Sequence, residues 1–139
     1  MVAFTGEEKL LKGSKENAFM NCRLGVITQD RGLEKVMERI SNHFGFDLRV
    51  FESCADFVDG FGNSDGGVVV VDGSVCSQPR LMDLQMVLND APQWRVLYLP
   101  RTNKKNEIKE AVELGAFGSL HKPLSEQEVR QMVQSAIGI

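Results

Sequence analysis

Charged residues follow three short, mainly apolar segments of this sequence. Asp72 follows four consecutive valines, Asp30 follows LGVITQ, and Lys122 follows GSLH. Carboxylates on neighbouring strands attract a hard divalent cation such as Mg²⁺, and a nearby lysine adds a positive charge for bound oxygen ligands. This chemistry requires that the fold bring the three side chains together.

The pattern around these residues predicts strands that alternate with helices. From Arg23 onward, short apolar runs alternate with stretches of helical period, which is typical of βαβ units and a parallel sheet. We expect strands at Leu24–Thr28, Leu48–Phe51, Val68–Val71, Val96–Leu99 and Gly118–His121, with one helix after each. The unbroken valine run favours a central strand that is covered on both faces.

Five strands and five helices in this length predict an α/β fold with a doubly wound, five-stranded parallel sheet. The expected strand order is 2-1-3-4-5, flavodoxin-like, with helices on both faces. Ligands of such sheets bind beyond the carboxyl ends of the strands. The candidate site residues are therefore those that follow the strands, namely Gln29, Asp30, Asp72, Pro100, Arg101, Thr102, Lys122 and Pro123.

Length and composition restrict the class of protein. The 139 residues suit one domain, which we place at 23–139 behind an N-terminal extension at 1–22. A net charge of -3 argues against direct nucleic-acid binding. No apolar segment predicts a signal peptide or a membrane span. Three cysteines without CxxC spacing favour a reduced, cytoplasmic protein.

The order of these segments resembles the receiver domain of two-component response regulators, from about Arg23 to the C-terminus. The matching segments are LGVITQDR, VVVVDGS and GAFGSLHKP. The resemblance implies that Asp72 is the phosphoacceptor and that Asp30, Asp72 and Ser74 hold Mg²⁺. It also implies a pocket that includes Lys122 and Pro123, joined by a cis peptide bond.

The sequence departs from the receiver pattern in ways that predict a degenerate pocket. Gln29 stands where receivers usually carry the first acidic residue, so Mg²⁺ binding should be weak. Pro100 replaces the expected Ser or Thr, and Arg101 and Thr102 follow it. Ser119 replaces an aromatic residue. We expect the Arg101 guanidinium to reach Asp72 and to replace the cation in part.

The resemblance implies a signalling domain rather than an enzyme. A sensor histidine kinase or small phosphodonor would phosphorylate it, and an output domain or partner protein would read it. A homodimer remains an open alternative. No membrane partner is expected.

Several other interpretations stay open. Asp72 could cap a turn, Asp30 could cap a helix, and Lys122 could be an ordinary exposed lysine. A pseudo-receiver would act only as an interaction or dimerisation module. A flavodoxin-like electron carrier is disfavoured because TQDRGL is poor in hydroxyl groups, and a nucleotide-binding enzyme because the glycines at 60–67 precede a strand.

Overall fold

The computed structural model describes residues 22–61, 65–76, 81–101 and 105–138. The strands are β1 (Arg23–Ile27), β2 (Asp47–Phe51), β3 (Gly67–Asp72), β4 (Trp94–Leu99) and β5 (Gly118–Ser119). The helices are α2 (Arg31–Phe44), α3 (Cys54–Phe61), α4 (Met82–Asp90), α5 (Lys105–Leu114) and α6 (Glu126–Ile137), with a 3₁₀ turn, η1, at Gly73–Val75. The predicted extension lies outside the described residues except for Cys22.

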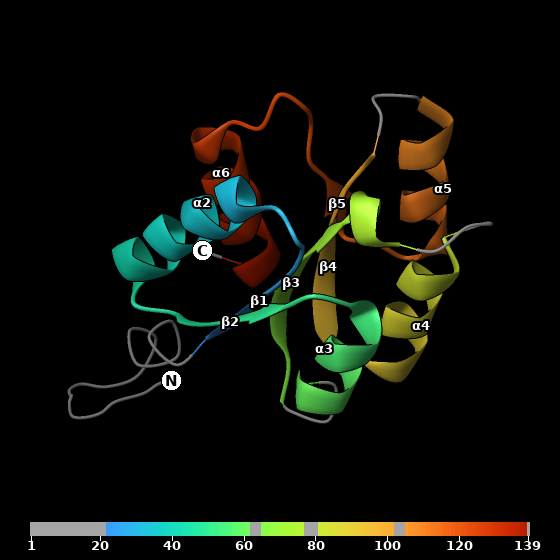
Figure 1. The fold of residues 1–139 in the computed structure, drawn as a ribbon, viewed down its shortest axis with the longest axis horizontal. Coiled ribbons are helices and arrows are strands. Elements are labelled where there is room, and N and C mark those ends of the chain that lie inside the picture. The colour runs from blue at the N-terminus through green and yellow to red at the C-terminus, as the bar shows by residue number, and fades with distance from the viewer. Residues whose placement is uncertain (1–21, 62–64, 77–80, 102–104, 139) are drawn as a thin grey trace.

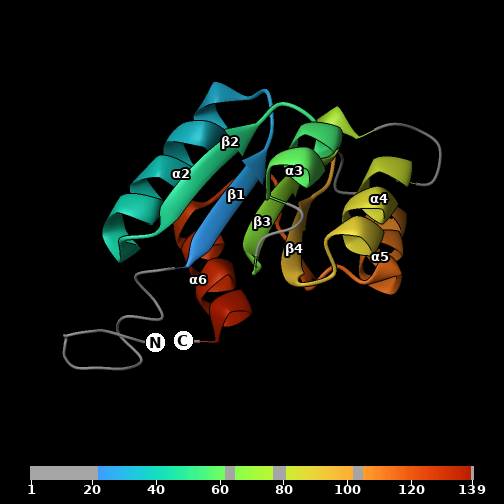
Figure 2. The ribbon, with the colours of Figure 1, turned by 90° about the horizontal axis from the view of Figure 1, so that it is seen from below.

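The strands form one parallel sheet in the order β2-β1-β3-β4-β5, as predicted. β3 occupies the centre, and its four valines are fully or almost fully buried. In Figure 1, α2 and α6 cover one face of the sheet, while α3, α4 and α5 cover the other. Figure 2 shows the same two layers from below. Apolar packing on both faces therefore fixes the strand that carries Asp72.

Local signals begin and end the helices at the expected places. Ser53 Oγ accepts a hydrogen bond from Asp56 N at 3.1 Å at the start of α3. Gly45 adopts φ 75° after α2, where its left-handed conformation ends the helix. Ser125 caps α6 by accepting from Glu128 N at 3.3 Å. The Glu128 carboxylate itself lies 2.6 Å from His121 Nδ1.

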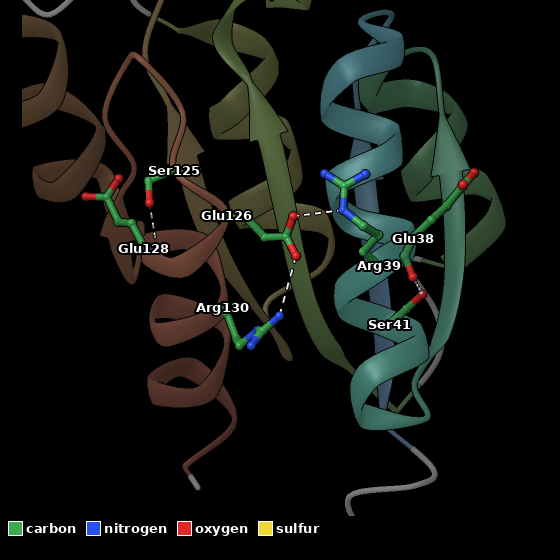
Figure 3. A network of polar contacts seen from close by, with 7 residues as sticks. All are labelled: Glu38, Arg39, Ser41, Ser125, Glu126, Glu128 and Arg130. Carbon is green, nitrogen blue, oxygen red and sulfur yellow. Dashed lines mark hydrogen bonds and ion pairs between the residues drawn. The ribbon is translucent and has the colours of Figure 1, made fainter.

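Polar side chains join α2 to α6 on the outside of their layer. Glu126 Oε1 lies 2.8 Å from Arg39 Nε on α2, and Glu126 Oε2 lies 3.4 Å from Arg130 Nη2 one helical turn later. Figure 3 shows Glu126 between the two arginines. Because this network is partly solvent-exposed, we expect it to contribute little more than about 1 kcal/mol.

Strand β5 is shorter than predicted, and the end of β4 explains why. Leu120 N still donates to Tyr98 O at 2.8 Å. In a continued parallel ladder the Leu120 carbonyl would accept from the backbone of residue 100, but proline has no N–H to donate. The Leu120 carbonyl accepts instead from Ser119 Oγ at 3.2 Å. Pro100 and Ser119, two departures from the receiver pattern, therefore meet at the end of this strand pair.

Candidate functional site

A cavity of about 230 Å³ opens at the carboxyl ends of the strands. Its described lining residues are Gln29, Asp30, Asp72, Ser74, Val75, Leu99 and Lys122. The structure thus brings together the two predicted carboxylates, the predicted lysine, Gln29 and Ser74. These side chains come from the ends of β1 and β3 and from the segment after β5, as expected for a doubly wound sheet.

Asp72 ends β3 and is almost completely buried, with 4% of its surface exposed. Its Oδ1 accepts a hydrogen bond from Ser74 N at 2.9 Å, so Asp72 caps the η1 turn. Its Oδ2 accepts from the Thr28 hydroxyl at 2.7 Å. Both oxygens of the buried carboxylate therefore have hydrogen-bond donors, which offset much of the cost of burying it.

Thr28 is a site residue that the sequence interpretation missed. The register pairs Ile27 with Val71, which places Thr28 beside Asp72 across the two neighbouring strands. Thr28 is fully buried, and its hydroxyl also accepts a hydrogen bond from Asp30 N at 3.0 Å. The only available signal was a hydroxyl residue at the end of an apolar strand. Thr28 therefore links the two acidic positions directly.

Asp30 has both of the roles that were considered for it. Its Oδ1 accepts from Gly32 N at 2.8 Å and so caps α2. Asp30 also lines the cavity. Its neighbour Gln29 donates through Nε2 to the Glu52 carbonyl at 3.4 Å. The Gln29 amide thus bridges the loops after β1 and β2 at the rim of the site.

Lys122 reaches the cavity from the segment that follows β5. The Lys122–Pro123 peptide bond is cis, which confirms that prediction. Lys122 is half-buried and lines the cavity. Pro123 is exposed and is not among the described residues that line the cavity, so its pocket role stays a prediction. Pro123 belongs to the turn that carries Lys122.

Arg101 does not pair with Asp72, and that prediction is wrong. Its Nε lies 3.7 Å from Glu107 Oε2 on α5, and its backbone N donates to the same oxygen at 2.8 Å. Glu107 is a nearer carboxylate along the chain and meets Arg101 at the start of α5. Thr102 lies outside the described residues.

The acidic residues of the cavity offer carboxylate oxygens, which are the ligands that hard divalent cations prefer. Among the described residues, no three His, Cys, Asp or Glu side chains cluster in a way that could hold a metal ion. Asp30 and Asp72 supply two carboxylates. Three of the carboxylate oxygens, both of Asp72 and Oδ1 of Asp30, already accept hydrogen bonds from protein donors. Because Ca²⁺ and Mg²⁺ affinity depends on the number of charged oxygen ligands, this donor set predicts weak binding.

A larger groove of about 530 Å³ runs between α2 and the edge strand β2. Its lining carries both signs of charge, with Arg31 and Lys35 beside Glu34 and Glu38. It shares Gln29 with the Asp72 cavity. Its acidic residue at a strand end, Glu52, follows the edge strand β2, whereas the smaller cavity has Asp72 at the end of the central strand, so the smaller cavity is the better candidate site.

Two cysteines lie close to the site and are shielded. Cys76 follows the η1 turn, and its Sγ lies 3.9 Å from the Asp72 carbonyl. A hydrogen bond with Cys76, together with burial, raises the pKa of the Cys54 thiol well above its usual range. Cys22 is only half-buried, and burial also raises the pKa of its thiol.

We expect only Cys22 to react readily with a thiol-modifying reagent in the folded protein. Burial shields the Cys54 and Cys76 thiols from the reagent, whereas Cys22 is partly exposed. The thiolate is the reactive form, and the raised pKa of Cys54 lowers its thiolate fraction further. Mass spectrometry after brief alkylation at mildly alkaline pH measures the sites, and the same reaction in denaturant should label all three cysteines. Rapid labelling of Cys54 or Cys76 without denaturant would contradict the packing described.

The strand order, together with the match to solved structures, shows that the chain has the fold of response regulator receiver domains. The resemblance predicted from the sequence is thus confirmed at the level of the fold. No protein-family model matches the chain. In the described part, no helix has the length and apolar character needed to cross a membrane.

Particular relatives are distant. The transcriptional regulatory protein TdiR of Thauera aromatica is 25% identical over 114 residues, which cover 82% of this chain and 50% of TdiR. Full-length FixJ from B. japonicum is 22% identical with a TM-score of 0.71, covering 84% of this chain and 57% of FixJ. The receiver domain of the sensor histidine kinase PA1611 from Pseudomonas aeruginosa, with magnesium in its active-site cleft, is 12% identical with a TM-score of 0.70. That match covers 86% of this chain and 99% of the receiver. The chain spans about half the length of TdiR and FixJ.

Proposed function

We propose that this chain is a receiver-type signalling domain in which Asp72 accepts a phosphoryl group only inefficiently. The observation that carries the proposal is the hydrogen bond of 2.7 Å from the buried Thr28 hydroxyl to Oδ2 of Asp72, a residue that lines one cavity with Asp30 and Lys122. The cavity supports the receiver role. The hydrogen bond supports the inefficiency.

Phosphorylation requires an Asp72 oxygen to attack the phosphorus of a donor. A hydrogen bond to a carboxylate stabilises its charge and makes it a weaker nucleophile until that bond breaks. Both Asp72 oxygens are held in this way, one by Thr28 and one by Ser74 N. With two cavity carboxylates, a Mg²⁺ ion that would offset the charge of the incoming group is weakly held.

Lys122 is the basic residue among the described residues that line the cavity. A lysine ammonium is a compact charge on a flexible stem, suited to follow the oxygens of a bound phosphoryl group. The proposed partners are a sensor histidine kinase or small phosphodonor and an output domain or partner protein. A pseudo-receiver that works through protein contacts alone is the second candidate, and the bonded state of Asp72 favours it.

We expect a small-molecule phosphodonor with Mg²⁺ to modify a minor fraction of the chains, and only at Asp72. Intact-protein mass spectrometry measures the fraction, and peptide mapping locates it. The matched control is Asp72→Asn, which keeps the size of the side chain and should stay unmodified. Nearly complete modification would show an ordinary phospho-switch and overturn the inefficiency. No modification at any donor concentration would favour the pseudo-receiver.

A further inference from the structure

A second buried polar contact joins Tyr98 to Glu107 on the face of the sheet that α3, α4 and α5 cover. Tyr98 in β4 is fully buried, and its hydroxyl donates to Glu107 Oε2 at 2.6 Å. The same oxygen accepts from Arg101 N at 2.8 Å. One carboxylate oxygen of α5 therefore collects hydrogen bonds from β4 and from the segment that leaves it.

Tyr98 also packs against the turn that follows Asp72. A Cβ placed on Gly73 would overlap the Tyr98 hydroxyl and would lie 3.0 Å from Tyr98 Cζ. Gly73 is the first residue of η1, which Asp72 caps. A continuous series of contacts thus runs from the Asp72 turn through Tyr98 to Glu107 on α5.

This contact is strong for its kind. Hydrogen bonds to an ionised carboxylate are about twice as strong as those between neutral groups. The Glu107 side chain is only 10% exposed, so water competes poorly for it. Burial, and then the hydrogen bond to Glu107, raises the pKa of the Tyr98 hydroxyl well above its usual range. Tyr98 therefore remains a donor throughout the neutral and mildly alkaline range.

The segment after β4 has no other hydroxyl in its described part. Pro100 has neither a hydroxyl nor an N–H group, and Leu99 is apolar. Within 99–101, the described side-chain and backbone donors that reach α5 belong to Arg101, and they reach Glu107. The position of this segment is thus tied to Glu107 rather than to residue 100.

We propose that Tyr98 and Glu107 form a latch, which positions residues 99–101 and the start of α5 and couples them to the turn after Asp72. The inference rests on the proposed function, because this coupling carries a signal only if the Asp72 site receives one. Within it, Tyr98 and Glu107 are positioning residues. Opening the latch would free Arg101 and the start of α5 and would change the packing of Tyr98 against the turn after Asp72.

Amide hydrogen exchange on the unmodified chain tests the latch. Tyr98→Phe removes only the hydroxyl, and Glu107→Gln keeps the shape of the side chain while it removes the charge. We expect the Arg101 amide, which donates to Glu107 in the parent chain, to exchange about fivefold faster in each variant, in line with the loss of one hydrogen bond. We also expect shifted NMR resonances at Gly73 and Ser74.

Two controls separate a latch from a general loss of stability. Val133→Ala removes core volume from α6 on the other face of the sheet, and Arg39→Gln removes the ion pair to Glu126. Neither should accelerate exchange of the Arg101 amide relative to the rest of the described chain. In the double variant of Tyr98 and Glu107, the effects should not add, because one contact is lost only once.

Unchanged exchange at Arg101, or equal acceleration in Val133→Ala, would overturn the latch. This outcome is independent of the proposed function, because no phosphodonor is present in the experiment. Conversely, failure of Asp72 to accept a phosphoryl group would leave the exchange result unaffected.

Discussion

Replacing Thr28 by aspartate is expected to make the stability of this domain depend on Mg²⁺. Thr28→Asp removes the hydroxyl that donates to Asp72 Oδ2 and puts a second carboxylate in its place. Without metal, the loss should be about 2 to 3 kcal/mol, because a buried acceptor loses its donor and two like charges come within contact distance. With Mg²⁺ present, a third carboxylate joins Asp30 and Asp72, and the loss should be recovered.

Thermal and urea unfolding with and without Mg²⁺ measure this effect. Mg²⁺ affinity should rise at least about tenfold, which corresponds to about 1.4 kcal/mol. The matched control is Thr28→Val, which has nearly the same shape but no hydroxyl and no charge. Thr28→Val should be destabilised by about 1 to 3 kcal/mol at every Mg²⁺ concentration. An aspartate variant whose stability ignores Mg²⁺ would show that position 28 does not face the cation site.

The sheet could be predicted because its signals are local and repeated. The four valines of Val68–Val71 identify a strand buried on both faces. Apolar residues at helical spacing before and after it predict helices, and a helix that connects two parallel strands makes a right-handed crossover. Once the strand order was known, the carboxyl ends of β1 and β3 had to meet. Asp30, Asp72 and Lys122 were therefore found from position alone.

The role of Thr28 could not be predicted, because it depends on register. A shift of one residue along a strand turns each side chain to the other face, and the sequence does not set the alignment of β1 on β3. The observed pairing of Ile27 with Val71 places the hydroxyl, rather than the Gln29 amide, beside Asp72. Position after the strand and the family resemblance had both drawn attention to Gln29 and Asp30, one and two residues later.

The error at Arg101 has a different cause. A long flexible side chain at a strand end can reach several partners, and its choice depends on the path of the connection that follows. Here α5 begins at Lys105 and presents Glu107 to the end of β4, so Arg101 contacts Glu107 first. The sequence predicted a helix after the fourth strand, and nothing in it indicated that Tyr98 would reach a carboxylate on that helix.

Gly73→Ala is expected to destabilise the domain and to disturb the turn after Asp72. The residue has no left-handed backbone conformation, so the cost comes from space rather than from strain. A new Cβ would overlap the Tyr98 hydroxyl and approach the Leu99 carbonyl to 2.9 Å. Overpacking of a filled core costs about 1 to 3 kcal/mol, and we expect a value near the upper end because one neighbour is backbone.

The same substitution in a Tyr98→Phe background isolates the cause. Without the hydroxyl, the alanine methyl group gains room, and Gly73→Ala should cost about 1 kcal/mol less than it does in the parent chain. Urea unfolding of the parent, the two single variants and the double variant gives this coupling energy. If the hydroxyl and the glycine were independent, the two losses would simply add. A coupling of the expected sign would establish that the residue after Asp72 and the donor to Glu107 compete for one space, and therefore that a movement of either displaces the other.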